Sequence, residues 1–521
     1  MRQSSISLRV RVSTPTRVNR SEHIRLYVTL LKILYEIQRM PALTFYGGVN
    51  EIGGNKILFE ADGTKLFLDF GMSFNVANQY FAEFLQPRKC TALTDFFELG
   101  LLPDITGVYR TDYLTHMGRP EEERSVDAVL LTHAHADHAQ YLHFLRPDIP
   151  IYCTEATRTI LQVVEETGSN PLSDLITACD AFTFYTNRRG TVSRVTRRNT
   201  EFVHERNFRV LEPEQRVTIG SVEIEVVPVD HSLPGACGYI IHSGEGTLVY
   251  TGDIRFHGSN QALSNRFIEK AKAAKPTWLV SEGTRIDNPQ QDSEAGVKNE
   301  ITRLIATARG PVFVEHPIRD LDRVNTIFEA ARANQREFVV PLKLAYLVEA
   351  MGSLAPFELG DVKIVVPKKS WGLIDRAGMD SRLIEQDYAN WERALINREN
   401  AMTCNELQNN PEHYVVSMSL WEITQLTDIQ PKAAIWIKSS CEPFSDEMIL
   451  DEERKRHWLD HFGIREYAAH ASGHASGSEL KAMITEIDPE RVFPVHTERP
   501  ELFKEFFTNV ELVEPGKRYT L

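Results

Sequence analysis

Four side chains that bind metal ions well stand within one short stretch of this chain, Thr132-His133-Ala134-His135-Ala136-Asp137-His138. An apolar run at 126–131 precedes them and has the length and β-branched content of a buried strand, and the residues that follow can open a helix. The stretch is therefore a strand-to-helix turn. Residues two apart in extended backbone point the same way, so His133 and His135 can share one ion. Asp137 and His138 come where the chain begins to form the helix, so their side chains would face a second ion.

Imidazole nitrogen together with carboxylate oxygen suits zinc, with manganese as the alternative. The competing interpretation is a chance gathering of surface histidines. Chance would have to place four infrequent residues at set offsets, which is rare even in a chain of 521 residues. The sequence therefore predicts two Zn²⁺ ions at this turn, or two Mn²⁺ ions in their place.

Further acids and histidines come directly after other predicted strands: Asp69, His231, Asp253, Glu282 and His496, which follow the runs 65–68, 223–230, 247–252, 277–281 and 491–495. A lone residue of this kind is usually a satisfied structural residue, and Asp69 has turn capping before Gly71 as its alternative role. Open α/β layers, however, place their sites where strand ends converge. We therefore expect these side chains to surround the same centre.

Composition and charge set limits on the function. The formal net charge of −14 argues against nonspecific coating of nucleic acid, but it allows a nuclease that confines positive potential to one groove. The six cysteines show no CxxC spacing and are typical of reduced thiols in a cytoplasmic protein. No apolar run approaches the roughly 20 residues that span a bilayer, so no membrane association is expected.

The chain divides into four predicted parts: an extension at 1–39, a metal-binding part at 40–283, an inserted part at 284–465 and a return at 466–521. The extension carries five arginines within residues 1–20 and an amphipathic pattern at 23–37. It is either a solvated extension before a start at Met40, a targeting segment or a partner-binding helix. The inserted part alternates strands and helices, which predicts a second domain with a parallel sheet.

Arginines gather at two other places. The segment 187–200 carries five arginines and no acid, so it is either a phosphate contact or a solvated hairpin tip. Arg319 and Arg323 stand at the start of the predicted helix 321–333, where they could meet phosphate or form surface salt bridges. Of these we keep Arg323 as a candidate for substrate binding.

The histidine stretch is the motif of the metallo-β-lactamase superfamily, and later segments resemble its β-CASP branch and, within that branch, the ribonuclease J family. The segments that carry this resemblance are Gly47 to Asn55, Ser281-Glu282-Gly283-Thr284, His470 to Ser476 and Pro494-Val495-His496-Thr497-Glu498. The resemblance implies an α/β fold, namely an αββα sandwich with an inserted parallel-sheet β-CASP domain. Bacterial ribonuclease J usually continues into a further C-terminal domain that this sequence lacks, so its usual dimer is in doubt, although a homodimer stays the candidate assembly.

The same resemblance implies the roles of individual residues. His133, His135 and His231 would hold one ion, Asp137, His138 and His496 the other, and Asp253 would bridge them. Asp69 would orient metal-bound groups, and Glu282 would orient His474 as the proton donor. Ser472, Gly473 and Ser476 would contribute a phosphate pocket.

The expected function is a metal-dependent ribonuclease that hydrolyses single-stranded RNA with a hydroxide activated by two metals, as a 5′-to-3′ exonuclease, an endonuclease or both. Histidine at position 496 favours RNA, because the DNA-repair nucleases of the branch have valine there. One alternative is a small-molecule metallo-hydrolase. Another is an inactive RNA-binding scaffold, although all seven expected ligands are present.

Overall fold

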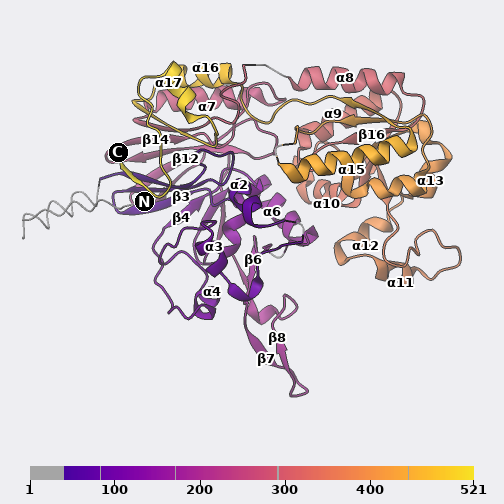
Figure 1. Ribbon diagram of the computed structural model, residues 1–521, viewed down its shortest axis with the longest axis horizontal. Coiled ribbons are helices and arrows are strands. Elements are labelled where there is room, and N and C mark those ends of the chain that lie inside the picture. The colour runs from indigo at the N-terminus through magenta and orange to yellow at the C-terminus, as the bar shows by residue number, and fades with distance from the viewer. Residues whose placement is uncertain (1–39, 83, 171, 290–292, 444) are drawn as a thin grey trace, which may run out of the picture.

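The computed structural model describes residues 40–82, 84–170, 172–289, 293–443 and 445–521. The extension predicted at 1–39 lies outside the described residues. Two β-sheets pack face to face near the described N-terminus, and a third sheet with its own helices stands beside them (Figure 1). Among the described helices, none is long and apolar enough to cross a membrane.

The first sheet has seven strands in the order β10-β5-β4-β3-β2-β1-β24. They are β1 (Ala42–Gly47), β2 (Lys56–Ala61), β3 (Thr64–Leu68), β4 (Ala128–Leu130), β5 (Ile151–Cys153), β10 (Phe208–Val210) and β24 (Arg518–Thr520). β3 and β4 run parallel, with Leu68 opposite Leu130. Since the two strands end side by side, Asp69 and the histidine turn emerge at the same edge of the sheet.

The second sheet has six strands in the order β11-β12-β13-β14-β15-β23. They are β11 (Arg216–Ile219), β12 (Val222–Pro228), β13 (Cys237–Ser243), β14 (Gly246–Tyr250), β15 (Trp278–Glu282) and β23 (Arg491–Val495). β14, β15 and β23 are parallel, with Glu282 opposite Val495. Their carboxyl ends therefore carry Asp253, Glu282 and His496 to one edge. The chain leaves this sheet after β15 and returns to pair with it at β23.

The core between the two sheets is apolar and closely packed. Phe45, Phe59, Tyr239 and Phe493 are completely buried there, and Phe45 stacks on Phe493 with ring centroids 5.9 Å apart. Burying one such side chain stabilises the fold by about 1.5–3 kcal/mol. The packed core therefore holds the ends of the strands in fixed positions.

Helices cover the outer faces of the two sheets. On one side lie α2 (Phe74–Tyr80), α3 (Thr94–Glu98), α4 (Thr111–His116) and α6 (Glu155–Thr167), and on the other α7 (Gln261–Ala273), α16 (Gly477–Ile487) and α17 (Phe503–Phe506). α6 begins where Thr154 accepts a hydrogen bond from the Thr157 amide, and it buries Ile160 and Leu161 against the first sheet. This arrangement confirms the αββα sandwich.

The third sheet is entirely parallel, in the order β19-β18-β17-β20-β16-β21-β22. Its strands are β16 (Val312–Glu315), β17 (Glu337–Pro341), β18 (Lys363–Val366), β19 (Ala401–Thr403), β20 (Tyr414–Ser417), β21 (Ile435–Lys438) and β22 (Arg465–Ala468). The parallel-sheet insertion predicted from the sequence is confirmed. The short edge strand β19 was not predicted, because its three residues lie within a polar, helix-like region.

Helices flank both faces of the third sheet. They are α8 (Glu294–Thr307), α9 (Leu321–Ala333), α10 (Leu342–Met351), α11 (Ser381–Ile384), α12 (Asn390–Ile396), α13 (Cys404–Asn409), α14 (Leu426–Ile429) and α15 (Asp446–Phe462). α8, α9 and α10 contribute to one core, and α13, α14 and α15 to another on the opposite face. Two small antiparallel sheets stand apart from the three large ones, β6 (Thr177–Cys179) with β9 (Val203–Glu205) and the hairpin β7 (Phe184–Thr186) with β8 (Val192–Arg194). The β7–β8 hairpin projects away from the sandwich (Figure 1).

Candidate metal centre

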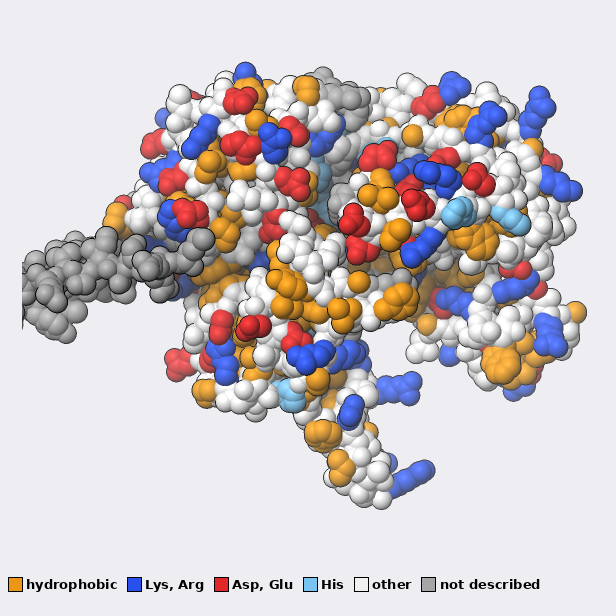
Figure 2. Space-filling view, in the orientation of Figure 1, with side chains coloured by type: hydrophobic (Ala, Val, Ile, Leu, Met, Phe, Trp, Pro, Cys, Tyr) orange, Lys and Arg blue, Asp and Glu red, His pale blue; other side chains and the backbone are white. Residues whose placement is uncertain are grey.

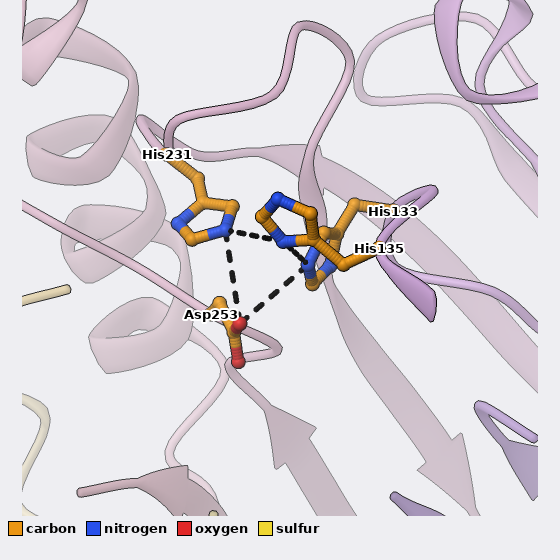
Figure 3. Close-up of side chains that lie close together, drawn as sticks. All are labelled: His133, His135, His231 and Asp253. Carbon is orange, nitrogen blue, oxygen red and sulfur yellow. Dashed lines mark hydrogen bonds and ion pairs between the residues drawn. The ribbon is translucent and has the colours of Figure 1, made fainter. Parts of the chain in front are cut away.

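Side chains from the strand ends of both stacked sheets converge at one place. They form three groups whose candidate ligand atoms lie within 4.8 Å of one another, namely His133, His135, His231 and Asp253; Asp137, His138 and His496; and Asp253, Glu282, His474 and His496. All seven predicted metal ligands are in these groups, together with Glu282 and His474. Figure 3 shows the His133 and His231 imidazoles turned toward the Asp253 carboxylate, with His135 facing both histidines.

The first group has the spacing of a tetrahedral zinc site. His135 Nδ1 lies 2.9 Å from His133 Nε2 and 3.2 Å from His231 Nε2. Asp253 Oδ2 lies 3.5 Å from His133 Nε2 and 3.7 Å from His231 Nε2. Ligand atoms about 2.05 Å from a tetrahedral zinc stand about 3.4 Å apart, so these four atoms fit one ion.

Asp253 of the first group also lies beside the second group. His138 Nε2 is 3.3 Å from Asp253 Oδ2 and 3.8 Å from Asp137 Oδ2, and His496 Nε2 is 3.2 Å from Asp137 Oδ2. His138 Nε2 and Asp253 Oδ1 are buried and have no hydrogen-bond partner in the described structure. Buried polar atoms are nearly always satisfied. Two orphaned ligand atoms facing the same space therefore fit a bound cation.

The protonation states suit metal binding as well. Burial lowers the pKa of His133 and His231 well below the ordinary histidine value and that of His135 to about 4. Burial alone would raise the pKa of Asp253, but the neighbouring His138 and His496 outweigh it and lower that pKa. In the first group, neutral imidazoles beside an ionised carboxylate are the forms that bind a metal. In the second group, Asp253, Asp69 and Asp137 outweigh burial and raise the pKa of His138 well above the ordinary histidine value, so this side chain would release a proton when a cation binds.

The second ring nitrogen of three of these histidines has a fixed partner. His138 Nδ1 donates to Asp69 at 2.7 Å, His231 Nδ1 donates to the Gly473 carbonyl at 2.6 Å, and His496 Nδ1 lies 2.8 Å from the Thr284 hydroxyl. Such bonds fix the tautomer and the direction of the ligating nitrogen. The role of Thr284 was missed from the sequence, although it stands within the quoted segment 281–284.

Asp69 is buried at the base of the centre. Besides His138 it accepts hydrogen bonds from the Tyr250 hydroxyl at 2.7 Å and from the amide of Thr132 at 2.7 Å. Tyr250 was missed from the sequence, because a tyrosine at the end of an apolar strand resembles any core residue. Asp69 has φ +58° and His496 has φ +53°, a backbone region that non-glycine residues seldom adopt. Such strain is typical of functional positions.

His474 stands at the edge of the centre beside Glu282. Its Nδ1 lies 2.8 Å from Glu282 Oε2, and the other oxygen of Glu282 accepts from the Ile254 amide at 2.7 Å. Burial lowers the pKa of His474, but Glu282 and Asp253 outweigh it and raise the pKa to about 9. The His474 side chain is 20% exposed, whereas that of His138 is completely buried. A protonated imidazole beside open space can donate a proton.

Two of the predicted substrate contacts are corrected by the structure. Arg323 is completely buried, and its guanidinium donates to Glu294, the Ser439 carbonyl and the Ala471 carbonyl. Ser476 is also completely buried and caps α16, accepting from the Glu479 amide. Neither side chain is available to a substrate. Arg323 was misjudged because its buried acidic partner, Glu294, comes from a different helix.

The other predicted substrate residues, Ser472 and Gly473, lie on the loop before α16 and are half-buried. The Gly473 carbonyl accepts from His231, and Ser472 Oγ accepts from the His474 amide at 3.1 Å. His257 Nε2 lies 2.9 Å from the Ser472 carbonyl, and its Nδ1 faces the Glu479 carboxylate at 3.2 Å. The loop is therefore fixed from both sides.

Comparison with known proteins agrees with this geometry. Residues 103–288 match the beta-lactamase superfamily domain, and residues 465–505 match the Zn-dependent metallo-hydrolase RNA specificity domain. Ribonuclease J of Mycolicibacterium smegmatis is 26% identical over 468 residues, covering 87% of this chain and 68% of that protein. Ribonuclease J of Thermus thermophilus is 22% identical over 483 residues, covering 87% and 67%.

A solved structure shares the fold. The crystal structure of a protein of unknown function from Enterococcus faecalis V583 superposes with a TM-score of 0.68 at 22% identity, covering 92% of this chain and 100% of that one. The stacked sheets and the histidine and carboxylate centre define a metallo-hydrolase of the metallo-β-lactamase superfamily. The match to the RNA specificity domain and these relatives make the chain similar to ribonuclease J of the β-CASP branch, and they support a ribonuclease hydrolase.

Proposed function

We propose that this protein hydrolyses phosphodiester bonds of single-stranded RNA with two Zn²⁺ ions, or Mn²⁺ in their place. The observation that carries the proposal is the position of Asp253, which belongs to the first ligand group and lies 3.3 Å from His138 and 3.7 Å from His496 of the second, with the His474–Glu282 pair directly beside it. Two neighbouring ions clamp the attacking and leaving oxygens of a phosphoryl displacement. The relatives named ribonuclease J and the RNA specificity domain support RNA as the substrate.

The chain provides three histidines for the first ion, His133, His135 and His231, and three residues for the second, Asp137, His138 and His496. Asp253 lies beside both groups and would serve as a ligand for either ion. When bound, the ions supply nucleophilic water at neutral pH and offset negative charge on the phosphoryl oxygens. Asp69 and the Gly473 carbonyl hold His138 and His231 in their ligating orientations.

His474 is the proton donor of this proposal. Its Nδ1 is engaged by Glu282, which leaves Nε2 as the nitrogen that can reach the departing 3′ oxygen. A proton delivered there leaves a 3′-hydroxyl on one product and a 5′-phosphate on the other. General acid catalysis of this kind contributes about 10²–10⁴-fold to rate.

The test is a time course on a 5′-labelled, 5′-monophosphorylated single-stranded RNA with Zn²⁺ or Mn²⁺, and with the Asp137→Ala variant as control. We expect cleavage that this variant loses, because it lacks a ligand of the second ion. Labelled mononucleotide from the earliest times means a 5′-to-3′ exonuclease, and longer labelled fragments mean an endonuclease. Absence of cleavage with either metal would instead support an RNA-binding scaffold, and turnover of a small ester alone would support a small-molecule hydrolase.

The cytoplasm is the compartment that we propose for this activity. All six cysteines are free thiols in the structure, as expected in a reducing compartment. A homodimer is the candidate assembly, and sedimentation of the zinc-loaded protein would determine it.

A further inference from the structure

A cavity of about 940 Å³ lies next to the metal centre but contains none of its ligands. Its walls come from the segment after β3, from α4, from the β7–β8 hairpin and from the first turn of α15. Met72 lines it, and the Met72 amide donates to the Ala136 carbonyl at 3.0 Å, one residue before Asp137. The cavity therefore reaches a residue whose backbone is hydrogen-bonded to the turn that carries the candidate metal ligands.

Aromatic side chains form one wall of this cavity. The ring of Phe182 stacks on His116 with centroids 3.7 Å apart and 7° between planes, and Tyr113 meets Phe182 edge-on at 5.5 Å. Phe182 has φ +57°, a strained conformation for a bulky residue. Phe184 also lines the cavity, and it is 62% exposed. An exposed ring beside a rigid stack offers a flat apolar face to a ligand.

Positive charge stands beside these rings. Phe184 lies directly opposite Arg194 in the β7–β8 hairpin, so their side chains are neighbours on one face, and both line the cavity. Arg188, Arg189 and Arg198 are exposed on the same hairpin segment. Among the described residues, neither Arg194 nor these three form an ion pair. Figure 2 shows Lys and Arg side chains gathered along this projection.

We propose that the cavity binds unpaired nucleobases of the RNA strand on one side of the cleaved bond, with Phe184 and Phe182 stacking on bases and Arg194 contacting phosphate. The proposal rests on the proposed ribonuclease function. Alternating aromatic and cationic contacts are how proteins hold single-stranded nucleic acid without reading its sequence. This hairpin concentrates arginines on a chain of net charge −14, so the positive potential is local.

Acidic side chains limit where the phosphates of the strand could lie. Glu447, from the first turn of α15, and Asp180 also line the cavity. Carboxylates repel phosphate but can accept hydrogen bonds from the amino groups of bases. The phosphates would therefore follow the hairpin, and the bases would point into the cavity.

The experiment compares the zinc-loaded wild type with the double variant Phe184→Ala/Arg194→Ala. The matched control is Trp421→Ala/Arg309→Ala, which removes an aromatic side chain that is 83% exposed and an exposed arginine, neither of which lines the cavity. KM and kcat are measured on a single-stranded RNA of about 20 nucleotides and on a trinucleotide. Losing one stacked base and one phosphate contact should raise the KM for the longer RNA by about tenfold or more. The trinucleotide offers fewer bases to the cavity, so its KM should rise less.

Binding is measured separately from cleavage, by fluorescence anisotropy of the labelled longer RNA on the Asp137→Ala background. Weaker binding in the cavity variant but not in the control supports the proposal even if no RNA is cleaved, an outcome that would refute only the ribonuclease function. Equal affinity in both variants, or no RNA binding at all, overturns the proposal and leaves the cavity to another ligand, such as a protein segment. Crosslinking of 4-thiouridine RNA should mark the segment 182–198, and crosslinks confined to other segments would also overturn it.

Discussion

The histidines of the centre differ in what holds their second ring nitrogen. In His138 and His231 that nitrogen donates to a fixed oxygen, and the other nitrogen faces the metal positions. In His474 the nitrogen nearest the centre is itself bonded to Glu282. His474 Nδ1 lies only 3.9 Å from Asp253, so distance alone does not exclude His474 as a metal ligand. We leave His474 out of the candidate ligands because that nitrogen is already bonded to Glu282.

This difference predicts opposite effects of two alanine substitutions. His474→Ala should lower kcat on RNA by about 10²–10⁴-fold while zinc content stays at the wild-type value, because a proton donor and not a ligand is lost. His138→Ala should lower both kcat and zinc content. Zinc per chain is measured by elemental analysis after gel filtration, beside the cleavage rate. Zinc loss from the His474 variant would assign that histidine to the metal site.

At the scale of elements, backbone hydrogen bonds hold the motif turn and the short helix α5 (Ala136–Ala139) against the loops after β1 and β3. The Asn55 amide donates to the Asp137 carbonyl at 3.0 Å, and the Phe70 amide donates to the His138 carbonyl at 2.8 Å. Between them Gly71 approaches so closely that a Cβ atom there would lie 1.7 Å from the Asp137 carbonyl oxygen. Only glycine permits this contact.

Gly71→Ala should therefore displace the turn that carries Asp137. We expect the free energy of unfolding to fall by about 1–3 kcal/mol or more, together with weaker zinc binding. Gly360→Ala is the matched control, because a Cβ atom there meets nothing within 4 Å. Urea unfolding and a zinc competition titration measure both effects. Equal unfolding free energies and equal zinc affinities of the two variants would contradict this prediction. They would mean that the loop after β3 can move away from the turn without loss of stability.

At the scale of the molecule, a buried ionic network joins the sandwich to the inserted domain. Glu294 of α8 accepts from Arg323 at 2.6 Å and from Arg255 at 3.3 Å, and Arg255 also donates to Asp230 at 2.9 Å. Asp230 immediately precedes the ligand His231. These four side chains are buried, so each charge depends on its partners rather than on water.

Glu294→Gln should destabilise the protein by about 3–5 kcal/mol, because it leaves the buried Arg323 guanidinium without its carboxylate and removes one of the carboxylates around Arg255. Glu300→Gln, on the same helix but in an exposed pair with Arg303, should cost less than about 1 kcal/mol. Urea unfolding monitored by tryptophan fluorescence compares the two. Similar losses would show that the network contributes no more than a surface pair.

The sequence by itself predicted the types of the candidate ligands and the elements that carry them. Fixed offsets in the segment 132–138 and apolar runs that end at Asp69, Asp253 and Glu282 were sufficient, because strand patterning and metal chemistry are local properties. The parallel-sheet insertion followed from the alternation of strands and helices in the same way.

Only the tertiary structure decided which side chains meet. It buried Arg323 against Glu294, used Ser476 as a helix cap, and brought Tyr250 and Thr284 to Asp69 and His496. It also turned the arginine-rich hairpin toward an aromatic cavity. The reason is physical: burial, hydrogen-bond partners and strained backbone depend on contacts between residues far apart in the chain, and no pattern within one segment records them.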